Sequence, residues 1–199
     1  MDEAILVKSD LPIERHPWEP FLPANAKVLF LGSFPPQRKR WCMDFYYPNF
    51  INDHWRIEGM IWFGDKDHFV DTQHKAFRRD TIIAFLNERG IGFYDTATAV
   101  RRLADNASDK FLEIVEPTDI DALIAPLKQL QALAVTGEKA CATLCAYYAL
   151  NEIPKTGTYA MLPNGLRLYR LPSSSRAYPL SLDKKAAAYK AMFVDLGMK

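Results

Sequence analysis

Four short apolar runs along the chain have the length and composition of buried strands. Each run leads into a glycine, an aspartate or a polar turn, and stretches with helical spacing of apolar residues separate the runs. The runs cover residues 27–32, 91–97, 132–137 and 166–172 (KVLFLG, IGFYDTA, ALAVTG and LRLYRLP). Apolar strands that alternate with helices predict an α/β fold, with a mainly parallel sheet covered by helices on both faces.

Five segments between and after these runs have the patterns of helices. Gly90 is the expected end of the second helix, and Thr118 and Ser181 are candidate N-caps for the third and fifth. The predicted helices cover residues 52–63, 72–88, 118–130, 138–150 and 181–196. The chain shows no repeat and no low-complexity linker, so residues 1–199 are expected to form a single domain.

The overall composition restricts the class of protein. Hydrophobic residues make up 49% of the 199, enough for a sizeable core. Lys and Arg number 25 against 24 Asp and Glu, for a formal net charge of +1. This balance excludes a histone-like, strongly basic protein but allows a local basic patch.

Neither a membrane segment nor a metal motif stands out in the sequence. No apolar run approaches the roughly 20 residues that a membrane helix needs. The N-terminal stretch (MDEAILVKSDLPIERHP) is charged and lacks the apolar region of a signal peptide, so we expect a cytoplasmic protein. The spacing of Cys42, Cys141 and Cys145 matches neither a zinc site nor a cluster-binding motif, and these residues are expected to be free thiols.

The location of a ligand site follows from the predicted sheet. In open parallel sheets, ligands bind outside the carboxyl ends of the strands. Three of the predicted strands run there into polar or turn-forming sequence, at residues 32–36 (GSFPP), 95–96 (DT) and 172–175 (PSSS). Residues 45–55 (FYYPNFINDHW) follow the first of these turns, and we expect them to fold over the same edge.

The three candidate segments each have an ordinary alternative. In GSFPP, the glycine lets backbone approach a ligand and the prolines stiffen the turn, but such turns are common between a strand and a loop. The serines, arginine and tyrosine of residues 171–181 (LPSSSRAYPLS) offer hydroxyl and backbone donors to an anionic backbone, or they form only the loop that enters the last helix. In residues 45–55, aromatic rings beside side-chain amides suit a pocket for an unstacked base. Asn52 could instead only cap the following helix.

Two charged segments complete the set of candidates. Arg38, Lys39 and Arg40 form a basic cluster between two of the candidate segments, where it could contact phosphate. The stretch GDKDHFVDTQH contains many potential metal ligands: Asp65, Asp67, His68, Asp71 and His74. Its spacing matches no motif with a stated mechanism, so a solvated turn between two helices is the favoured interpretation.

Five segments in this order resemble motifs of the uracil-DNA glycosylase superfamily, and most closely those of its mismatch-specific and hypoxanthine-DNA glycosylase branches. They are LFLGSFPP, YYPNFINDHW, GIGFYDTA, AVTGEKA and LPSSSRAY, and the resemblance covers about residues 24–196. It implies a three-layer α/β/α sandwich around a four-stranded, mainly parallel sheet. The implied activity is a monofunctional DNA-repair glycosylase for base excision. Such an enzyme flips a deaminated base (uracil, hypoxanthine or similar) out of the duplex, hydrolyses its N-glycosidic bond and leaves an abasic site.

The resemblance also implies roles for residues that match the motifs. Tyr47 falls at the base-stacking position and Asn52 at the catalytic asparagine, and Asp53 beside it is a candidate water-orienting carboxylate. Phe34 stands where other branches have an asparagine or aspartate, so this chain is similar to the branch without a first-motif water activator. Base contacts are then expected from Gly32, Ser33, Phe34, Tyr47 and Asn49, and DNA contacts from Arg38, Lys39, Arg40, Ser173, Ser174, Ser175 and Arg176, with Arg176 near the wedge position.

The implied partner is DNA that contains a deaminated or mismatched base, with no cofactor, no metal, no membrane and no obligate protein partner. The iron–sulfur branches need cysteines that this chain lacks. The chain departs from the motif at Asn49 and Phe50, which replace histidine and proline, and at His54, which replaces phenylalanine. Two other functions therefore stay open: a catalytically silent module that binds damaged or single-stranded DNA, and a metal-dependent hydrolase that uses Asp65, Asp67, His68 and His74.

Overall fold

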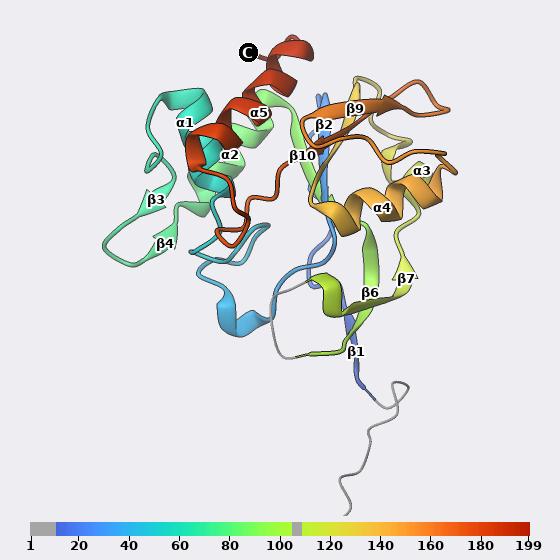
Figure 1. Ribbon diagram of the computed structural model, residues 1–199. Helices are drawn as coiled ribbons and strands as arrows, with labels where there is room; N and C mark the ends of the chain where they lie inside the picture. The colour runs from blue at the N-terminus through green and yellow to red at the C-terminus, as the bar shows by residue number, and fades with distance from the viewer. Residues whose placement is uncertain (1–10, 105–108) are drawn as a thin grey trace, which may run out of the picture.

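A five-stranded sheet forms the centre of the protein, which a computed structural model describes over residues 11–104 and 109–199 (Figure 1). The strand order is β5-β2-β8-β10-β9. The strands are β2 (Val28–Gly32), β5 (Ile91–Asp95), β8 (Ala132–Thr136), β9 (Thr158–Met161) and β10 (Arg167–Leu171). The first four in spatial order are parallel, which confirms the predicted sheet, and β9 adds an antiparallel edge that was not predicted.

The difference between the predicted strands and β9 lies in their burial. Residues 28–31 of β2 and 132–135 of β8 are fully buried, because helices cover both faces of the sheet. Such strands are apolar throughout and easy to recognise in a sequence. In β9, Tyr159 and Met161 are exposed, and this edge strand has only one neighbour, β10.

Helices form a layer on each side of the sheet, so the fold is the expected three-layer α/β/α arrangement (Figure 1). One layer contains α1 (His54–Phe63), α2 (Arg79–Arg89) and α5 (Leu182–Asp195), and the other contains α3 (Ile120–Ile124) and α4 (Glu138–Tyr147). Gly90 ends α2 with a left-handed φ of 68°, and Ser181 caps α5 by accepting a hydrogen bond from the Lys184 N–H, both as predicted.

Two helix predictions are partly wrong. The predicted helix at 72–88 begins only at Arg79, because the preceding residues form a small hairpin of β3 (Val70–Asp71) and β4 (Ala76–Phe77). The helix predicted over 118–130 is the five-residue α3, whose N-cap is Asp119. Thr118 is not the cap, because its hydroxyl donates to the buried Asp95 carbonyl oxygen. Pro126 follows the C-cap Ala125 and has no backbone N–H, so the helical hydrogen bonding of α3 cannot continue at that position.

A second, antiparallel sheet follows directly after β5 and was not predicted. It consists of β1 (Ile13–Arg15), β6 (Ala97–Arg102) and β7 (Leu112–Pro117), in the order β1-β6-β7. Figure 1 shows it beyond the end of the central sheet. Phe34, from the loop after β2, packs with Ala97, Val100 and Leu112 in a small core of its own. The second sheet therefore lies against the segment in which the sequence places a ligand site.

Two expectations from the sequence concern membranes and location. None of the helices within residues 11–104 and 109–199 combines the length and the apolar character needed to cross a bilayer. The charged N-terminal stretch on which the expected cytoplasmic location rests begins with residues 1–10, which lie outside the described residues.

Candidate active site

A cleft of about 960 Å³ lies at the carboxyl ends of the parallel strands. The last residues of all four strands line it: Gly32 of β2, Asp95 of β5, Thr136 of β8 and Leu171 of β10. The chain passes from β2 to β5 on one side and later to β8 on the other, so β2 stands at the switch point of the sheet. The cleft is thus where an open α/β sheet is expected to bind a ligand.

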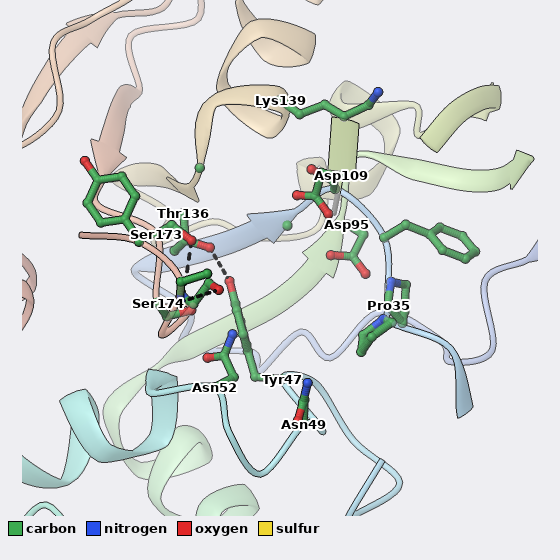
Figure 2. Close-up of a pocket in the computed structure, with 18 of the residues that line it drawn as sticks. Pro35, Tyr47, Asn49, Asn52, Asp95, Asp109, Thr136, Lys139, Ser173 and Ser174 are labelled. Atoms are coloured by element: carbon green, nitrogen blue, oxygen red, sulfur yellow. Dashed lines mark hydrogen bonds between the residues drawn. The ribbon is translucent and has the colours of Figure 1, made fainter. Parts of the chain in front are cut away.

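Tyr47 contributes an aromatic ring to this cleft (Figure 2). Its backbone has a φ of 49°, a left-handed conformation that is uncommon for a bulky residue. The ring stacks on His54, with centroids 3.9 Å apart and planes 5° apart, and the hydroxyl is 2.6 Å from Thr136 Oγ1. Burial raises the pKa of the Tyr47 phenol well above its ordinary value, so the ring is neutral. These contacts hold the ring rigidly in place.

One face of the Tyr47 ring, which lines the cleft, is free of contact with other aromatic rings of the described residues. His54 covers the other face, and the remaining ring neighbours of Tyr47 are Trp55 and Phe93. Trp55 lies 4.9 Å from His54 but 6.4 Å from Tyr47, and Phe93 lies 5.3 Å from His54 but 6.0 Å from Tyr47. A ring on the face of Tyr47 opposite His54 would be much farther from His54 than from Tyr47, so neither Trp55 nor Phe93 covers that face.

Asn52 lines the cleft and directly precedes Asp53, the N-cap residue of α1, whose side chain makes no capping hydrogen bond. Its side-chain oxygen accepts a hydrogen bond from the His54 N–H at 2.9 Å. This contact identifies the oxygen of the amide and leaves the NH₂ group without a partner in residues 11–104 and 109–199. The backbone of Asn52 is held by a bridge to Ser175 of the loop after β10. Asn52 is therefore not the N-cap that the sequence suggested, but its oxygen still binds the first N–H of α1 while its NH₂ group stays available to the cleft.

Asp53 has a different environment from the one expected of a water-orienting carboxylate. Its Oδ1 accepts a hydrogen bond from Arg176 Nε at 2.9 Å, and its Oδ2 lies 3.6 Å from Lys185 Nζ. Asp53 is buried and is not among the residues that line the cleft. The geometry thus assigns Asp53 to an ion-pair network that joins the start of α1 to the loop after β10.

The serines of that loop all line the cleft, but their hydroxyls are engaged locally. Ser173 Oγ accepts from the Ser175 N–H at 3.2 Å, and Ser175 Oγ accepts from the Ala177 N–H at 3.3 Å. Ser174 is only 2% exposed, and its hydroxyl is hydrogen-bonded to the hydroxyl of Tyr189. These residues shape the loop, and Arg176 at its end borders the cleft with its guanidinium bound to Asp53.

The basic cluster divides into an outer and an inner part. Arg38 and Lys39 are exposed on a 3-10 turn (Arg38–Arg40) and do not line the cleft, and the Arg38 guanidinium lies 5.3 Å from the Trp41 ring centroid. Arg40 does line the cleft, and its buried Nε has no hydrogen-bond partner within the part of the chain that the structure describes. The other expected base contacts, Gly32, Ser33, Phe34 and Asn49, are all at the cleft.

Asp95 and His16 form a buried pair that the sequence did not single out. His16 Nε2 is 2.8 Å from Asp95 Oδ2, and the side chains are 3% and 10% exposed. The other carboxylate oxygen lies over Gly32, where a Cβ atom would overlap it. Asp95 was visible as an aspartate at a strand end, but 79 positions separate it from His16, so local patterns could not reveal the pairing.

Asp109 supplies a second carboxyl group to the cleft (Figure 2). It is hydrogen-bonded by the Ser33 hydroxyl. Burial raises its pKa, although Ser33, Lys139 and Arg102 act in the opposite direction. Asp109 was also missed, because it precedes no recognisable strand or motif. Asp95 and Asp109 are thus two carboxyl groups on the side of the cleft formed by β5 and the second sheet.

The alternative metal ligands do not come together. Asp65 Oδ1 accepts from the Asp67 N–H, Asp71 pairs with His74 Nδ1 at 2.7 Å, and the His68 ring stacks on Phe63. No group of three or more His, Cys, Asp or Glu side chains able to hold a metal ion occurs in residues 11–104 and 109–199. The segment forms turns around the β3–β4 hairpin, close to the solvated turn that the spacing favours.

Comparison with solved structures identifies the fold. A solution NMR structure of a "putative Uracil DNA glycosylase" from Methanosarcina acetivorans matches with a TM-score of 0.63, over 94% of this chain and 99% of that one. The chain has a uracil-DNA glycosylase-like fold. The two sequences are 23% identical, so the likeness concerns the fold. Neither a scan against family models nor a search of curated proteins gives a match to this chain.

Proposed function

We propose that this protein is a DNA glycosylase that removes a deaminated base after the base has left the DNA helix. The observation that carries the proposal is the Tyr47 ring, which is stacked on His54 and lines the cleft at the carboxyl edge of the parallel sheet together with the Asn52 amide. The glycosylase-like fold and the order of the sequence motifs support it. The site suits a flat, uncharged ring with a polar edge.

The Tyr47 ring is a platform on which a base can stack. Stacking of a base on an aromatic side chain contributes about 1–3 kcal/mol per base. His54 behind it prevents the ring from turning away, and Thr136 fixes its outer end. Burial lowers the pKa of His54 to about 3, so this support stays uncharged near neutral pH. The cost of moving a base out of the duplex is thereby partly offset by a rigid surface in the cleft.

The Asn52 amide supports a preference for deaminated bases. Deamination of cytosine or adenine replaces an exocyclic amino group, a donor, with a carbonyl oxygen, an acceptor. The Asn52 amide presents its NH₂ group, a donor, to the cleft, because the oxygen of the same amide already accepts a hydrogen bond from the His54 N–H. It pairs with the carbonyl oxygen of uracil or hypoxanthine and meets a donor on the parent base. The same NH₂ group stabilises the negative charge that develops on the departing base.

The charge of the cleft favours a nucleic acid. Six basic residues line it against three acidic residues, Asp95, Asp109 and Glu138. The basic residues are Arg40, Arg102, Lys110, Lys139, Arg170 and Arg176. Positive side chains around the site of chemistry position a DNA backbone through its phosphates, while the pocket selects the base.

The test is a panel of oligonucleotides that each carry one modified base, in single- and double-stranded form. We expect the wild-type protein to release uracil, hypoxanthine or a related base, with strand scission after alkali as the readout. Salt-dependent binding without scission would identify a silent DNA-binding module instead. Scission that a chelator abolishes would point to the metal-dependent alternative at residues 65–74.

A further inference from the structure

We propose that Asp95 is the catalytic carboxylate that activates the attacking water, and that His16 is the residue that positions it. The inference rests on the proposed glycosylase function and assigns the group that performs its hydrolytic step. Asp95 ends β5 within the segment GIGFYDTA, in which the resemblance implied no catalytic residue.

The Asp95 carboxylate is held at the end of β5 with one oxygen directed to the cleft. Gly32 is its direct partner across the β2–β5 pair, and the absence of a side chain there leaves room for Asp95 Oδ1. Figure 2 shows the carboxylate pointing into the open space between Tyr47 and Pro35. Oδ1 accepts no hydrogen bond from any residue in 11–104 or 109–199, so it is available to a water molecule.

His16 fixes the second oxygen of the carboxylate. Its Nε2 donates to Asp95 Oδ2, and its Nδ1 faces the backbone carbonyl and N–H of Trp18 at 2.8 and 3.2 Å. Phe34 and Tyr94 pack against the imidazole, with ring centroids 5.5 and 4.6 Å away. The ring is thus locked by hydrogen bonds at both nitrogens and by aromatic contacts, and Asp95 cannot rotate without losing its partner.

Three other groups at or near the cleft, Asp53, Asn52 and Asp109, are less suited to this step. The Asp53 carboxylate is bound to Arg176 and Lys185. The Asn52 oxygen accepts the His54 N–H, and an amide is a poor base. Asp109 is hydrogen-bonded by Ser33. Asp95 alone among these groups combines a fixed orientation with an oxygen that no described residue engages.

The proposed step transfers one proton and exchanges one bond. The water oxygen forms a bond to C1′ of the deoxyribose while the C1′–N bond breaks. The electron pair of the C1′–N bond leaves with the base, which the Asn52 NH₂ group stabilises. The proton of the water passes to Asp95 Oδ1. Before the water attacks, the negative carboxylate also stabilises the positive charge that develops on the sugar.

The test measures single-turnover base release on the substrate that the oligonucleotide panel identifies. Asp95→Asn keeps the shape of the side chain and its contact with His16 but removes the carboxylate that accepts the proton. We expect a loss of roughly 100-fold or more in rate with DNA binding retained. Asp80→Asn is the matched control, because the Asp80 side chain is 96% exposed on α2, away from the cleft. This control should keep the wild-type rate.

His16 is tested by a separation of rate and affinity. His16→Ala leaves the carboxylate in place but unanchored, so we expect roughly a tenfold fall in kcat with KM nearly unchanged. His16→Gln retains an N–H donor and should recover part of kcat. A merely structural histidine would lower stability in both variants without this recovery.

The outcomes distinguish the two proposals. Wild-type release with an equal rate in Asp95→Asn rejects the role of Asp95 and leaves the glycosylase function standing, whereas no release by the wild type from any oligonucleotide rejects both. Should Asp95→Asn fail to fold by circular dichroism, Gly32→Ala decides, because its Cβ displaces Asp95 Oδ1 while the carboxylate remains. A wild-type rate in Gly32→Ala overturns the proposal.

Discussion

Asn52 shows how one side chain serves both the fold and the site. Its oxygen binds the His54 N–H at the start of α1, and this same contact orients the NH₂ group. A free surface asparagine would present either end of its amide to a ligand. The hydrogen bond to the His54 N–H removes this freedom before any substrate binds, so the proposed preference for an acceptor on the base would originate in the local structure of the helix start.

Substitution of Asn52 should separate these two functions. Asn52→Ala removes this hydrogen bond and the donor, and we expect a loss of about 1 kcal/mol in stability and of roughly 100-fold in base release. Asn52→Asp keeps an acceptor for the His54 N–H but has no NH₂ group, so it should retain stability and still lose activity. Urea unfolding and single-turnover release measure the two effects. Normal release by the aspartate variant would exclude the amide as a donor to the base.

The support beneath Tyr47 contains a buried pair, His54 and Glu58. Their side chains are fully buried, with His54 Nε2 and Glu58 Oε1 3.7 Å apart, too far for a hydrogen bond. Burial raises the pKa of Glu58 to about 8 and lowers that of His54 to about 3. Near pH 7 both groups are therefore neutral, and their closeness is not an ion pair. Within the part of the chain that the structure describes, the Glu58 carboxyl accepts a hydrogen bond from Trp62 Nε1 at 2.9 Å.

This environment predicts a stability that falls at alkaline pH. The folded state retains the Glu58 proton up to about pH 8, whereas an unfolded glutamate loses it near 4.5, so stability decreases as pH rises between these values. Between pH 6.5 and 9 the loss should be about 2 kcal/mol. Glu58→Gln keeps an acceptor for Trp62 and should remove this dependence, as measured by urea unfolding. The His54 effect lies below pH 6.5, outside this window. If the unfolding free energies of the wild type and Glu58→Gln changed equally with pH, the explanation through Glu58 would be refuted.

At the level of secondary-structure elements, the hydrophobic pattern of the sequence predicted the strands whose two faces are both buried. The four parallel strands are apolar throughout and were predicted almost to the residue, for example 132–137 against Ala132–Thr136. The strands β1 and β6, with sequences IER and ATAVRR, lack such a pattern, and their pairing joins residues that are far apart in the chain. The hairpin of β3 and β4 was mistaken for helix because its few apolar residues happen to fall at helical spacing.

Local sequence patterns also limited how much of the site could be predicted. Tyr47 and Asn52 were recognisable because aromatic rings and amides stand together in one short stretch, and both line the cleft. The contacts that define Asp53 and Asp95 come from distant segments, Arg176 and Lys185 for one and His16 for the other. Residue types at a site can thus be predicted from a motif, while the partners that orient them depend on the tertiary fold.

The turn that precedes Asn52 presents an exposed hydrophobic side chain at the cleft. The Asn52 N–H donates to the Asn49 carbonyl at 2.8 Å, and the Ile51 N–H donates to Asn49 Oδ1 at 3.2 Å. Phe50 is anchored by Arg56, whose guanidinium lies 4.8 Å from the ring centroid. Ile51 is left 54% exposed and lines the cleft. Apolar side chains in such positions can enter the gap that a flipped base leaves in the stack.

Ile51→Ala should therefore impair release from duplex DNA but not from single strands. A single strand has no stack to fill, so the side chain matters only in the duplex, where we expect roughly a tenfold loss. Val194→Ala is the matched control, because Val194 is 53% exposed on α5 and does not line the cleft. Paired single-turnover assays on both DNA forms measure the effect. An equal loss on both forms would argue against a role in filling the stack.

On the scale of the whole molecule, the cleft is a meeting point of separate parts of the chain. The central sheet provides its floor, the second sheet with Asp109 and Lys110 forms one side, and the segment at 46–52 and the loop after β10 form the other. The Asp53 network and the Asn52–Ser175 bridge tie these last two segments together. The formal net charge is only +1, so the positive character of the cleft is a matter of arrangement and not of composition.

Arg40 is the side chain whose substitution best tests DNA binding in the cleft. It lines the cleft, and its buried Nε has no hydrogen-bond partner in residues 11–104 and 109–199, so a phosphate oxygen would satisfy it. Loss of one phosphate contact should reduce the slope of log Kd against log salt by about one unit. We expect this change in Arg40→Ala, by fluorescence anisotropy at several potassium chloride concentrations. Arg89→Ala provides the control, because Arg89 on α2 lies 4.9 Å over the Trp62 ring and does not line the cleft. If both variants show the wild-type slope, the phosphate path does not pass Arg40, and if both lower it equally, binding is not confined to the cleft.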